Sequence, residues 1–204
     1  MSRILVIGAR GRAGSAAVSE ARRRGHEVTA VARSGGSGLV AGDVTDAGRL
    51  AELAAGHDAV IAAVYDGGSD PAVFFPQAAG ALSSGLAKAG VNRLVWVGLA
   101  SILPVADGTL LMDTDGYPNE YRSFYLSHQA ALEVFRPSAL DWVSVAPAGD
   151  FNHAAPARVG SYQVIPAAAD ELISYDDLAI ALVDEVDRPR FHREAIGVTA
   201  GQLV

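Results

Sequence analysis

The sequence of 204 residues contains no cysteine, only one lysine (Lys88) and no long apolar run. Without cysteine the chain can form no disulfide, zinc–thiolate centre or iron–sulfur cluster, and it has no cysteine nucleophile. The apolar run at 4–7 is too short for a signal-peptide core, and no stretch approaches the ~20 apolar residues of a membrane span. These absences predict a cytoplasmic protein with no membrane partner.

The composition is that of an acidic globular chain. Half of the residues are hydrophobic and the formal net charge is −7. A chain of this length can bury a sizeable core, so we expect one domain over residues 1–204. The acidic balance gives no general attraction for nucleic acid, which is therefore not an expected partner. The five histidines have no metal-ligand spacing, and no metal site is predicted.

Short apolar runs alternate with helical patterns along the chain. Strands are predicted at 3–8, 26–33, 38–46, 57–64, 91–101, 140–149 and 193–200, and helices at 14–26, 46–56, 76–90, 120–136 and 173–189. This alternation is typical of an α/β fold, a doubly wound parallel sheet of the Rossmann type with helices on both faces. Ligands bind at the carboxyl edge of such sheets, where we place loops near 65–75, 102–118 and 150–172.

The stretch "GARGRAG" follows the first apolar strand and opens the first helix. Gly8 permits a tight turn, Gly11 lets the backbone approach a pyrophosphate, and Gly14 lets the helix pack close to the strand. The free N–H groups of the first helical turn, which contains Ala13, would then face the anion. A glycine-rich turn without a ligand is the alternative, but the strand–turn–helix context favours dinucleotide binding.

The end of the second strand indicates which dinucleotide is bound. NAD-binding proteins usually place an acid there, whereas this chain has Arg33 followed by Ser34 and no acid between positions 27 and 43. A guanidinium matches a 2′-phosphate, and Arg10 and Arg12 in the turn could add to it. The pattern favours NADP(H) and leaves NAD(H) open.

Further cofactor contacts are expected at the ends of the third and fourth strands. Asp43 and Val44 follow the third strand, where related proteins contact adenine. The small residues Ala62, Ala63 and Val64 end the fourth strand and would leave room for the cofactor. Just beyond them, in the loop at 65–75, two polar side chains would line its nicotinamide end: Tyr65 and Asp66.

The spacing G-x-x-G-x-x-G resembles that of the extended and atypical short-chain dehydrogenase/reductases. Downstream, "ALSSGLAKAGVNRLVWVGLAS", "MDTDGYPNEYRSFYLSHQAALEVFR", "LDWVSVAPAGDF" and "ELISYDDLAIALVDEVDRPRFHREAIGVT" resemble the NAD(P)H-binding family that includes NmrA-like proteins and NADH-flavin reductase-type proteins. The resemblance covers nearly the whole chain. It implies a Rossmann fold with a small C-terminal substrate-side region. It also implies reduction of flavins, quinones or similar carbonyl compounds in some members and loss of catalysis in others.

The resemblance also indicates where catalysis would occur. Short-chain reductases use a Tyr-x-x-x-Lys pair and a serine at the end of the fifth strand. Ser101 and Tyr125 match the serine and the tyrosine, but Gln129 replaces the lysine and cannot acidify a phenol by its charge. His128, beside them, is expected at the surface. His153 is a second candidate for a proton donor or substrate ligand.

An NADPH-dependent reductase of a flat conjugated acceptor is the leading functional hypothesis. An oxidised flavin or quinone accepts hydride readily, so positioning can supply most of the rate without the missing lysine. Flavin would then be a small-molecule substrate and not a bound cofactor. A non-catalytic redox sensor of the NmrA-like kind is one alternative. A lyase, isomerase or oxygenation enzyme on the same fold is another, and the oligomeric state is left open.

Overall fold

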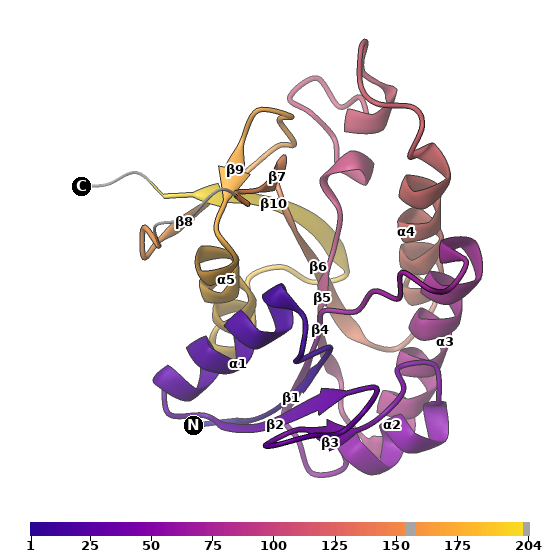
Figure 1. Cartoon of the computed structure of the whole chain (residues 1–204), viewed down its shortest axis with the longest axis vertical. Coiled ribbons are helices and arrows are strands. Elements are labelled where there is room, and N and C mark those ends of the chain that lie inside the picture. Colours follow the sequence, from indigo (N-terminus) through magenta and orange to yellow (C-terminus); the bar gives the residue numbers. More distant parts are fainter. Residues whose placement is uncertain (154–157, 202–204) are drawn as a thin grey trace.

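The computed structural model describes residues 1–153 and 158–201, and Figure 1 shows its arrangement. The helices are α1 (Arg12–Arg23), α2 (Ala47–Ala54), α3 (Pro71–Ala89), α4 (Arg122–Phe135) and α5 (Tyr175–Asp187), with short 3-10 turns η1 (Ala100–Ile102) and η2 (Leu111–Asp113). The strands are β1 (Arg3–Ile7), β2 (Glu27–Ala32), β3 (Val40–Ala41), β4 (Ala59–Ala62), β5 (Arg93–Val97), β6 (Asp141–Pro147), β7 (Asp150–Phe151), β8 (Tyr162–Ile165), β9 (Leu172–Ile173) and β10 (Glu194–Ala200).

Among the described residues, eight strands form one sheet in the order β3-β2-β1-β4-β5-β6-β10-β8. All neighbours pair in parallel except β10 and β8, which pair antiparallel. Strand order reverses between β1 and β4, and a crevice forms at such a switch point outside the carboxyl ends of the strands. The predicted α/β Rossmann-type fold is confirmed.

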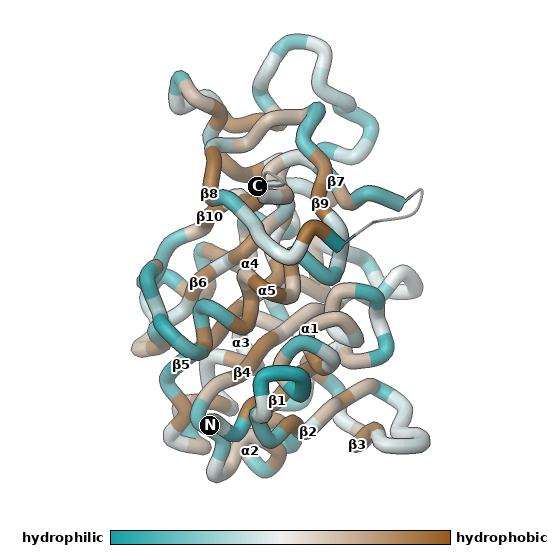
Figure 2. Tube along the Cα trace, turned by 90° about the vertical axis from the view of Figure 1, so that its left-hand side faces the viewer, coloured by the Kyte–Doolittle hydropathy of each residue, from teal (hydrophilic) through white to brown (hydrophobic). Residues whose placement is uncertain are grey.

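Helices cover both faces of the sheet, as predicted. On one face α1 and α5 pack together, and their apolar side chains include Ala17 and Leu178. On the other face α3 packs between α2 and α4 over a core that contains Phe75 and Trp96. Trp96 and Trp142 are both buried in this core. Hydrophobic colour in Figure 2 lies mainly along the strands, and the connecting loops are mostly hydrophilic.

Helix α3 begins five residues before the predicted start at position 76. The Oδ1 atom of Asp70 accepts a hydrogen bond of 2.9 Å from the N–H of Ala72 and so caps the helix, and Pro71 occupies the first helical position. Pro76 lies inside the helix, near its start, and does not end it. The earlier start places Phe74 on the helix and turns it toward the carboxyl edge of the sheet.

Two expected loops contain more structure than the sequence predicts. In 102–118, η2 and an isolated bridge between Pro104 and Leu110 fold the chain back, and Leu103 and Leu111 are buried. In 150–172, β7 pairs in parallel with β9, and β8 extends the main sheet. Part of this second loop, residues 154–157, lies outside the described residues.

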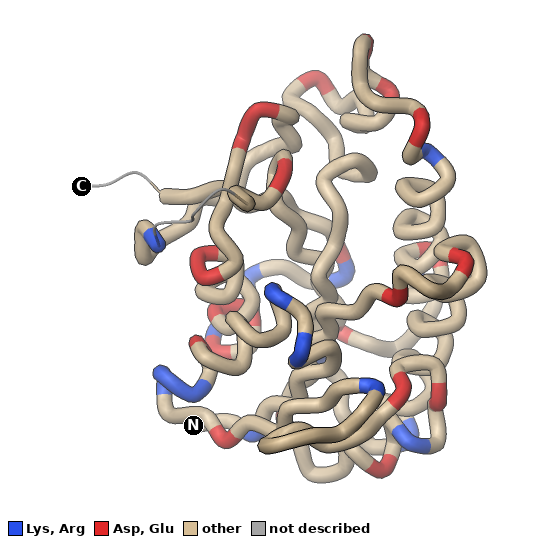
Figure 3. The backbone as a smooth tube through the Cα atoms, viewed as in Figure 1, with Lys and Arg blue, Asp and Glu red and all other residues tan. Residues whose placement is uncertain are grey.

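Charged residues lie mainly on loops and helix ends (Figure 3). Two positive segments stand at the N-terminal end of α1, where the sequence has Arg10 and Arg12. Within the described part of the chain, no group of three or more His, Asp or Glu side chains is arranged to hold a metal ion. No helix built from those residues is long and apolar enough to cross a bilayer.

Candidate functional site

A cleft of about 1030 Å³ opens at the carboxyl ends of β1, β4 and β5. Its volume is at the upper end of the range for small-molecule sites, about 300–1,000 Å³. Most of the residues predicted to hold the cofactor line it: Gly8, Arg10, Gly11, Arg12, Ala13, Arg33, Ser34, Asp43, Val44, Ala63 and Val64. Gly14 and Ala62 are buried behind the lining.

The glycine turn is closely packed against neighbouring backbone. Gly8 has φ +84°, and a Cβ on it would overlap the carbonyl oxygen of Ala63. A Cβ on Gly14 would overlap the carbonyl oxygen of Gly8 itself. The N–H groups of Gly8 and Ala9 both donate to the carbonyl oxygen of Val31, at 3.0 and 2.9 Å. Side chains are therefore excluded from both positions, and the turn is held against β2 and β4.

The N-terminus of α1 is left open toward the cleft. Helices α2, α3 and α5 are capped by the side chains of Asp46, Asp70 and Ser174, whereas Gly11 at the start of α1 provides no side-chain cap. The first turn of α1 also contains no acidic residue. Uncapped N–H groups and the positive end of a helix dipole fit an anion, and the pyrophosphate of a dinucleotide is such a group.

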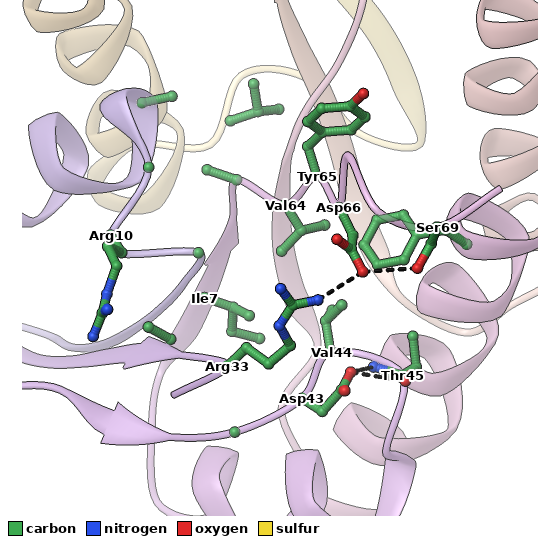
Figure 4. A pocket seen from close by; sticks show the side chains of 18 of the residues that line it. Ile7, Arg10, Arg33, Asp43, Val44, Thr45, Val64, Tyr65, Asp66 and Ser69 are labelled. Carbon is green, nitrogen blue, oxygen red and sulfur yellow. Dashed lines mark hydrogen bonds and ion pairs between the residues drawn. The ribbon is translucent and has the colours of Figure 1, made fainter. Parts of the chain in front are cut away.

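One half of the cleft, here called the arginine end, is formed by Arg10, Arg33, Ser34 and Asp43. Arg33 follows β2, and its Nη1 atom donates to Oδ2 of Asp66 at 2.6 Å across the cleft (Figure 4). Its side chain is 70% exposed, so the guanidinium is accessible from solvent. An accessible guanidinium at this position suits a phosphate on the adenosine ribose.

Asp66 is held by several donors at once. The hydroxyl of Ser69 donates to it at 2.7 Å, the N–H of Gly68 at 3.1 Å, and Arg33 completes the set. The Ser69 and Gly68 hydrogen bonds, together with the Arg33 charge, lower the pKa of the Asp66 carboxyl below its ordinary value. Asp66 was expected at the nicotinamide end, but its carboxylate turns toward the arginine end.

The side chains of Arg10 and Asp43 hold the backbone of the two loops at the arginine end. Nη2 of Arg10 donates to the carbonyl oxygens of Ser34 and Gly35, at 3.0 and 3.2 Å, and so ties the glycine turn to the loop after β2. Asp43 accepts from both the N–H and the hydroxyl of Thr45, at 2.9 and 2.7 Å. These bonds fix the two loops between which an adenosine would lie.

The opposite half, here called the aromatic end, is formed by Tyr65, Phe74, Val97, Gly98 and His128. Tyr65 directly precedes Asp66 in the chain, but the two side chains point to different sides of the loop (Figure 4). Tyr65 is 64% exposed as a residue. This end therefore offers an accessible aromatic surface.

Two further rings support the aromatic end from behind. The Phe124 ring is edge-on to Tyr65 at 5.6 Å, and Phe75 stacks near Tyr65 at 6.3 Å. His128 lies 3.9 Å from Phe75 and 4.9 Å from Phe124, measured between ring centroids. The four rings form one cluster that joins the loop after β4 to α3 and α4.

The expectation that His128 lies at the surface is wrong. The residue is only 7% exposed and lines the cleft. Burial alone lowers the pKa of its imidazole to about 3, so the ring is neutral at pH 7. It lies one helical turn after Tyr125, and its burial follows from the packing of α4 on α3, which local sequence does not show.

The wall formed by β7 and the start of α5 carries a second aromatic pair. Phe151 and Tyr175 stack with centroids 4.1 Å apart and an interplanar angle of 14°, and both line the cleft. The Arg12 guanidinium lies 5.8 Å from the Tyr175 centroid, and its Nη1 atom is 3.1 Å from Nδ1 of His153. Because a guanidinium only donates, Nδ1 accepts. His153 is exposed and lies outside the cleft lining, where it anchors Arg12.

The predicted catalytic pair lies in a separate buried cluster. Ser101 is 2% exposed, and its Oγ atom is 2.9 Å from the hydroxyl of Tyr117. Tyr125 is 7% exposed, and its ring lies 5.6 Å from that of Tyr117. Neither Ser101 nor Tyr125 is part of the cleft lining. Burial and the nearby Tyr117 and Glu120 raise the pKa of the Tyr125 phenol, the opposite of what a catalytic lysine would do.

The cleft also contains residues that the sequence does not single out, although 69–75 and Phe151 fall in two of the loops expected at this edge. They include residues from six separate segments: Thr45; Ser69, Asp70, Val73, Phe74 and Gln77; Val97 and Gly98; His128; Phe151; and Tyr175. The Asp-Pro pair at 70–71 was the available signal for the second group, since it marks a helix start. From the expected loop at 102–118, none of the described residues reaches the lining.

Comparison with known proteins agrees with this geometry. Residues 8–189 match the family model described as NAD(P)H-binding. The uncharacterized protein YwnB of Bacillus subtilis (strain 168) is 34% identical over 213 residues, which cover 97% of this chain and 98% of that protein.

Two solved structures show the same fold along nearly the whole chain. A "putative exported protein" from Burkholderia pseudomallei has a TM-score of 0.85 and 37% identity, covering 98% of this chain and 100% of that one. A "putative NADH-flavin reductase" from Streptococcus pneumoniae TIGR4 also has a TM-score of 0.85, with 29% identity and the same coverage. The glycine turn, the open helix N-terminus and the family match lead to one conclusion: the chain belongs to the NAD(P)H-binding family.

Proposed function

We propose that this protein is an NADPH-dependent reductase that transfers hydride to a flat conjugated acceptor, such as a flavin, a quinone or a polyketide-like aromatic. The observation that carries the proposal is the aromatic end of the cleft. Tyr65 is exposed there and His128 lines the same cleft, while Ser101 and Tyr125 lie outside the lining. A flat ring can stack on an exposed aromatic side chain. The similar structure named "a putative NADH-flavin reductase" supports this substrate class, although that name gives NADH and not NADPH.

The chemistry divides between cofactor and protein. When bound, a reduced nicotinamide supplies the hydride. The chain fixes the cofactor through the glycine turn and the first turn of α1, and it presents rings against which an acceptor can be oriented. Reduction of an isolated ketone needs an acid at the carbonyl oxygen, but Tyr125 has a raised pKa and no lysine beside it. A quinone or flavin needs less acid assistance, because its product is stabilised by conjugation.

The preference for NADPH over NADH is part of the proposal. It is supported by Arg33 and Ser34 at the end of β2, by Arg10 nearby, and by the lack of an acid at that strand end. The Asp66 carboxylate weakens this preference for NADPH, because it neutralises part of the Arg33 charge. A 2′-phosphate would compete with Asp66 for the same guanidinium.

The proposal is tested with purified protein by following NADPH oxidation with a panel of acceptors. FMN, riboflavin and menadione represent conjugated acceptors, and cyclohexanone and a simple aldehyde represent isolated carbonyls. We expect turnover with members of the first group and at most a trace with the second. Tight NADPH binding without turnover of any conjugated acceptor would contradict the proposal and favour a non-catalytic redox sensor.

A further inference from the structure

The polar atoms of His128 are not accounted for by the fold. The ring is packed between Phe75 and Phe124, and no hydrogen bond to either of its nitrogens exists among the described residues. Its Nδ1 atom is fully buried without a partner. Leaving a polar atom unpaired in the interior costs roughly 1–3 kcal/mol, and the cost is lower when that atom is a lone pair than when it is an N–H.

The two ring nitrogens differ in their surroundings. His128 lines the cleft, and because Nδ1 is the fully buried nitrogen, Nε2 is the one that faces it. An unpaired N–H is costlier to bury than an unpaired lone pair. The single proton of the neutral ring therefore belongs on Nε2. The ring thus presents a hydrogen-bond donor to the aromatic end of the cleft.

No neighbouring charge alters this state. Burial by itself accounts for the lowered pKa of the His128 imidazole, and the aromatic rings packed against it are those of Phe75 and Phe124. A neutral ring keeps its Nε2 proton from acidic to alkaline pH. Such a group donates a hydrogen bond well but does not release its proton, unlike an imidazolium acid.

We propose that His128 is the residue that binds the acceptor, donating a hydrogen bond from Nε2 to a carbonyl oxygen of the conjugated ring that lies against Tyr65. This inference rests on the proposed reductase function and assigns the acceptor-binding role to a residue other than Tyr125. The donor stabilises negative charge as it develops on that oxygen during hydride transfer. The proton that finally neutralises the oxygen comes from water, so His128 itself gains and loses none.

The first test observes His128 directly and needs no turnover. Protein with ¹⁵N-labelled histidine is saturated with NADP⁺, which cannot reduce the acceptor, and then titrated with riboflavin or menadione. Comparison with the His128→Phe variant assigns the His128 signals. We expect the spectrum of a neutral ring protonated at Nε2, and a shift of the Nε2 signal as the acceptor binds. Acceptor binding, seen as quenching of protein fluorescence, without a change at His128 would overturn the inference and leave the reductase proposal standing.

The second test is kinetic and uses matched variants. His128→Phe keeps an aromatic ring against Phe75 but removes the donor, and His128→Gln replaces the ring with an amide that can donate. Ser127→Ala, whose hydroxyl in the wild type donates to the carbonyl oxygen of Ser123 within α4, controls for disturbance of the helix.

We expect His128→Phe to lower kcat/KM for the acceptor roughly 3- to 10-fold, as for loss of one neutral hydrogen bond, while the Kd for NADPH is unchanged. His128→Gln should recover part of the loss, and Ser127→Ala should resemble the wild type. A loss of NADPH affinity in His128→Phe would assign the residue to the nicotinamide instead and overturn the inference, as would unchanged kinetics. If the wild-type protein neither binds nor reduces any acceptor, the reductase proposal fails and the role of His128 fails with it.

Discussion

The two ends of the cleft differ in how they recognise a ligand. The arginine end is polar and open, and its groups already pair with each other, as Arg33 does with Asp66. The aromatic end is built from packed rings, and among the described residues neither nitrogen of His128 has a hydrogen-bond partner. A charged group at the arginine end can exchange its present partner for a ligand of the same charge, whereas the Nε2–H of His128 gains its first partner when a ligand binds. The comparison assigns cofactor selectivity to the first end and acceptor orientation to the second.

The largest expected effect comes from breaking the turn that joins the two ends. Gly8 and Gly25 share a φ of +84°, but a Cβ on Gly8 would overlap the carbonyl oxygen of Ala63, whereas Gly25 has nothing within 4 Å. Gly8→Ala should therefore lower the free energy of unfolding by about 2–4 kcal/mol, from strain plus overlap, and abolish dinucleotide binding. Gly25→Ala should lower the free energy of unfolding by only about 1 kcal/mol and still bind the dinucleotide. Thermal unfolding measures the stability of each variant, and titration with NADPH measures its binding. Equal effects in the two variants would show that the close approach of Gly8 to β4 is unimportant.

Removing charge at the arginine end should affect one cofactor and not the other. Arg33→Ala should weaken NADPH about 10- to 100-fold, the effect of losing charge-assisted hydrogen bonds to a phosphate, and weaken NADH much less. The two Kd values are compared by fluorescence titration at fixed ionic strength. Comparable losses for both cofactors would show that Arg33 does not read the 2′-phosphate.

The neutral state of His128 should be visible in the pH dependence of stability. Because burial lowers the pKa of the folded-state imidazole to about 3, the unfolded chain binds a proton below about pH 6.5 that the folded chain does not. The contribution of the neutral His128 ring to the free energy of unfolding is thus fully present above pH 6.5. It is lost as the pH falls toward 3, by up to about 1.4 kcal/mol per pH unit. When the free energy of unfolding is measured with urea at several pH values between 6.5 and 4.5, its decrease should be smaller in His128→Phe than in the wild type. Parallel wild-type and variant curves would mean that the ring is not buried in its neutral form.

The smallest expected effect sharpens the difference between the ends. Asp66→Asn leaves an amide of the same shape that can still accept from Ser69 but no longer neutralises Arg33. We expect NADPH to bind a few-fold more tightly, as for an exposed ion pair of about 0.2–1 kcal/mol, with little change for NADH. Acceptor KM should not change, because the Asp66 carboxylate points away from Tyr65 (Figure 4). Weaker NADPH binding in this variant would mean that Asp66 holds Arg33 in its binding position instead of competing with the phosphate.

The two ends also differ in how far their sequence could predict them. Gly8, Arg10 and Arg33 lie within one strand–helix–strand unit, where local spacing fixes geometry, and the alternation of strands and helices was sufficient to predict the fold. The aromatic end combines Tyr65 and Phe74 with His128, Phe151 and Tyr175, which only the packing of α3, α4 and α5 brings to one cleft. A histidine on a helix gives no local sign of which face will be buried.

The start of α3 differs from the prediction for a physical reason. The pattern from Pro76 onward predicts a helix that begins there, but a proline near the N-terminus of a helix removes few hydrogen bonds and is tolerated inside the first turns. The Asp-Pro pair at 70–71 carried the stronger start signal. The loop expected near 65–75 includes Phe74 and so already places it at the carboxyl edge; the structure adds that Phe74 lies on α3.

The decisive measurement is a crystal structure of the ternary complex with NADP⁺ and riboflavin. We expect the adenosine ribose phosphate at Arg33, the pyrophosphate at the glycine turn, and the flavin ring against Tyr65 with a carbonyl oxygen within hydrogen-bonding distance of Nε2 of His128. A flavin bound elsewhere, or one seated at the Ser101–Tyr125 cluster without contact to His128, would contradict this expectation.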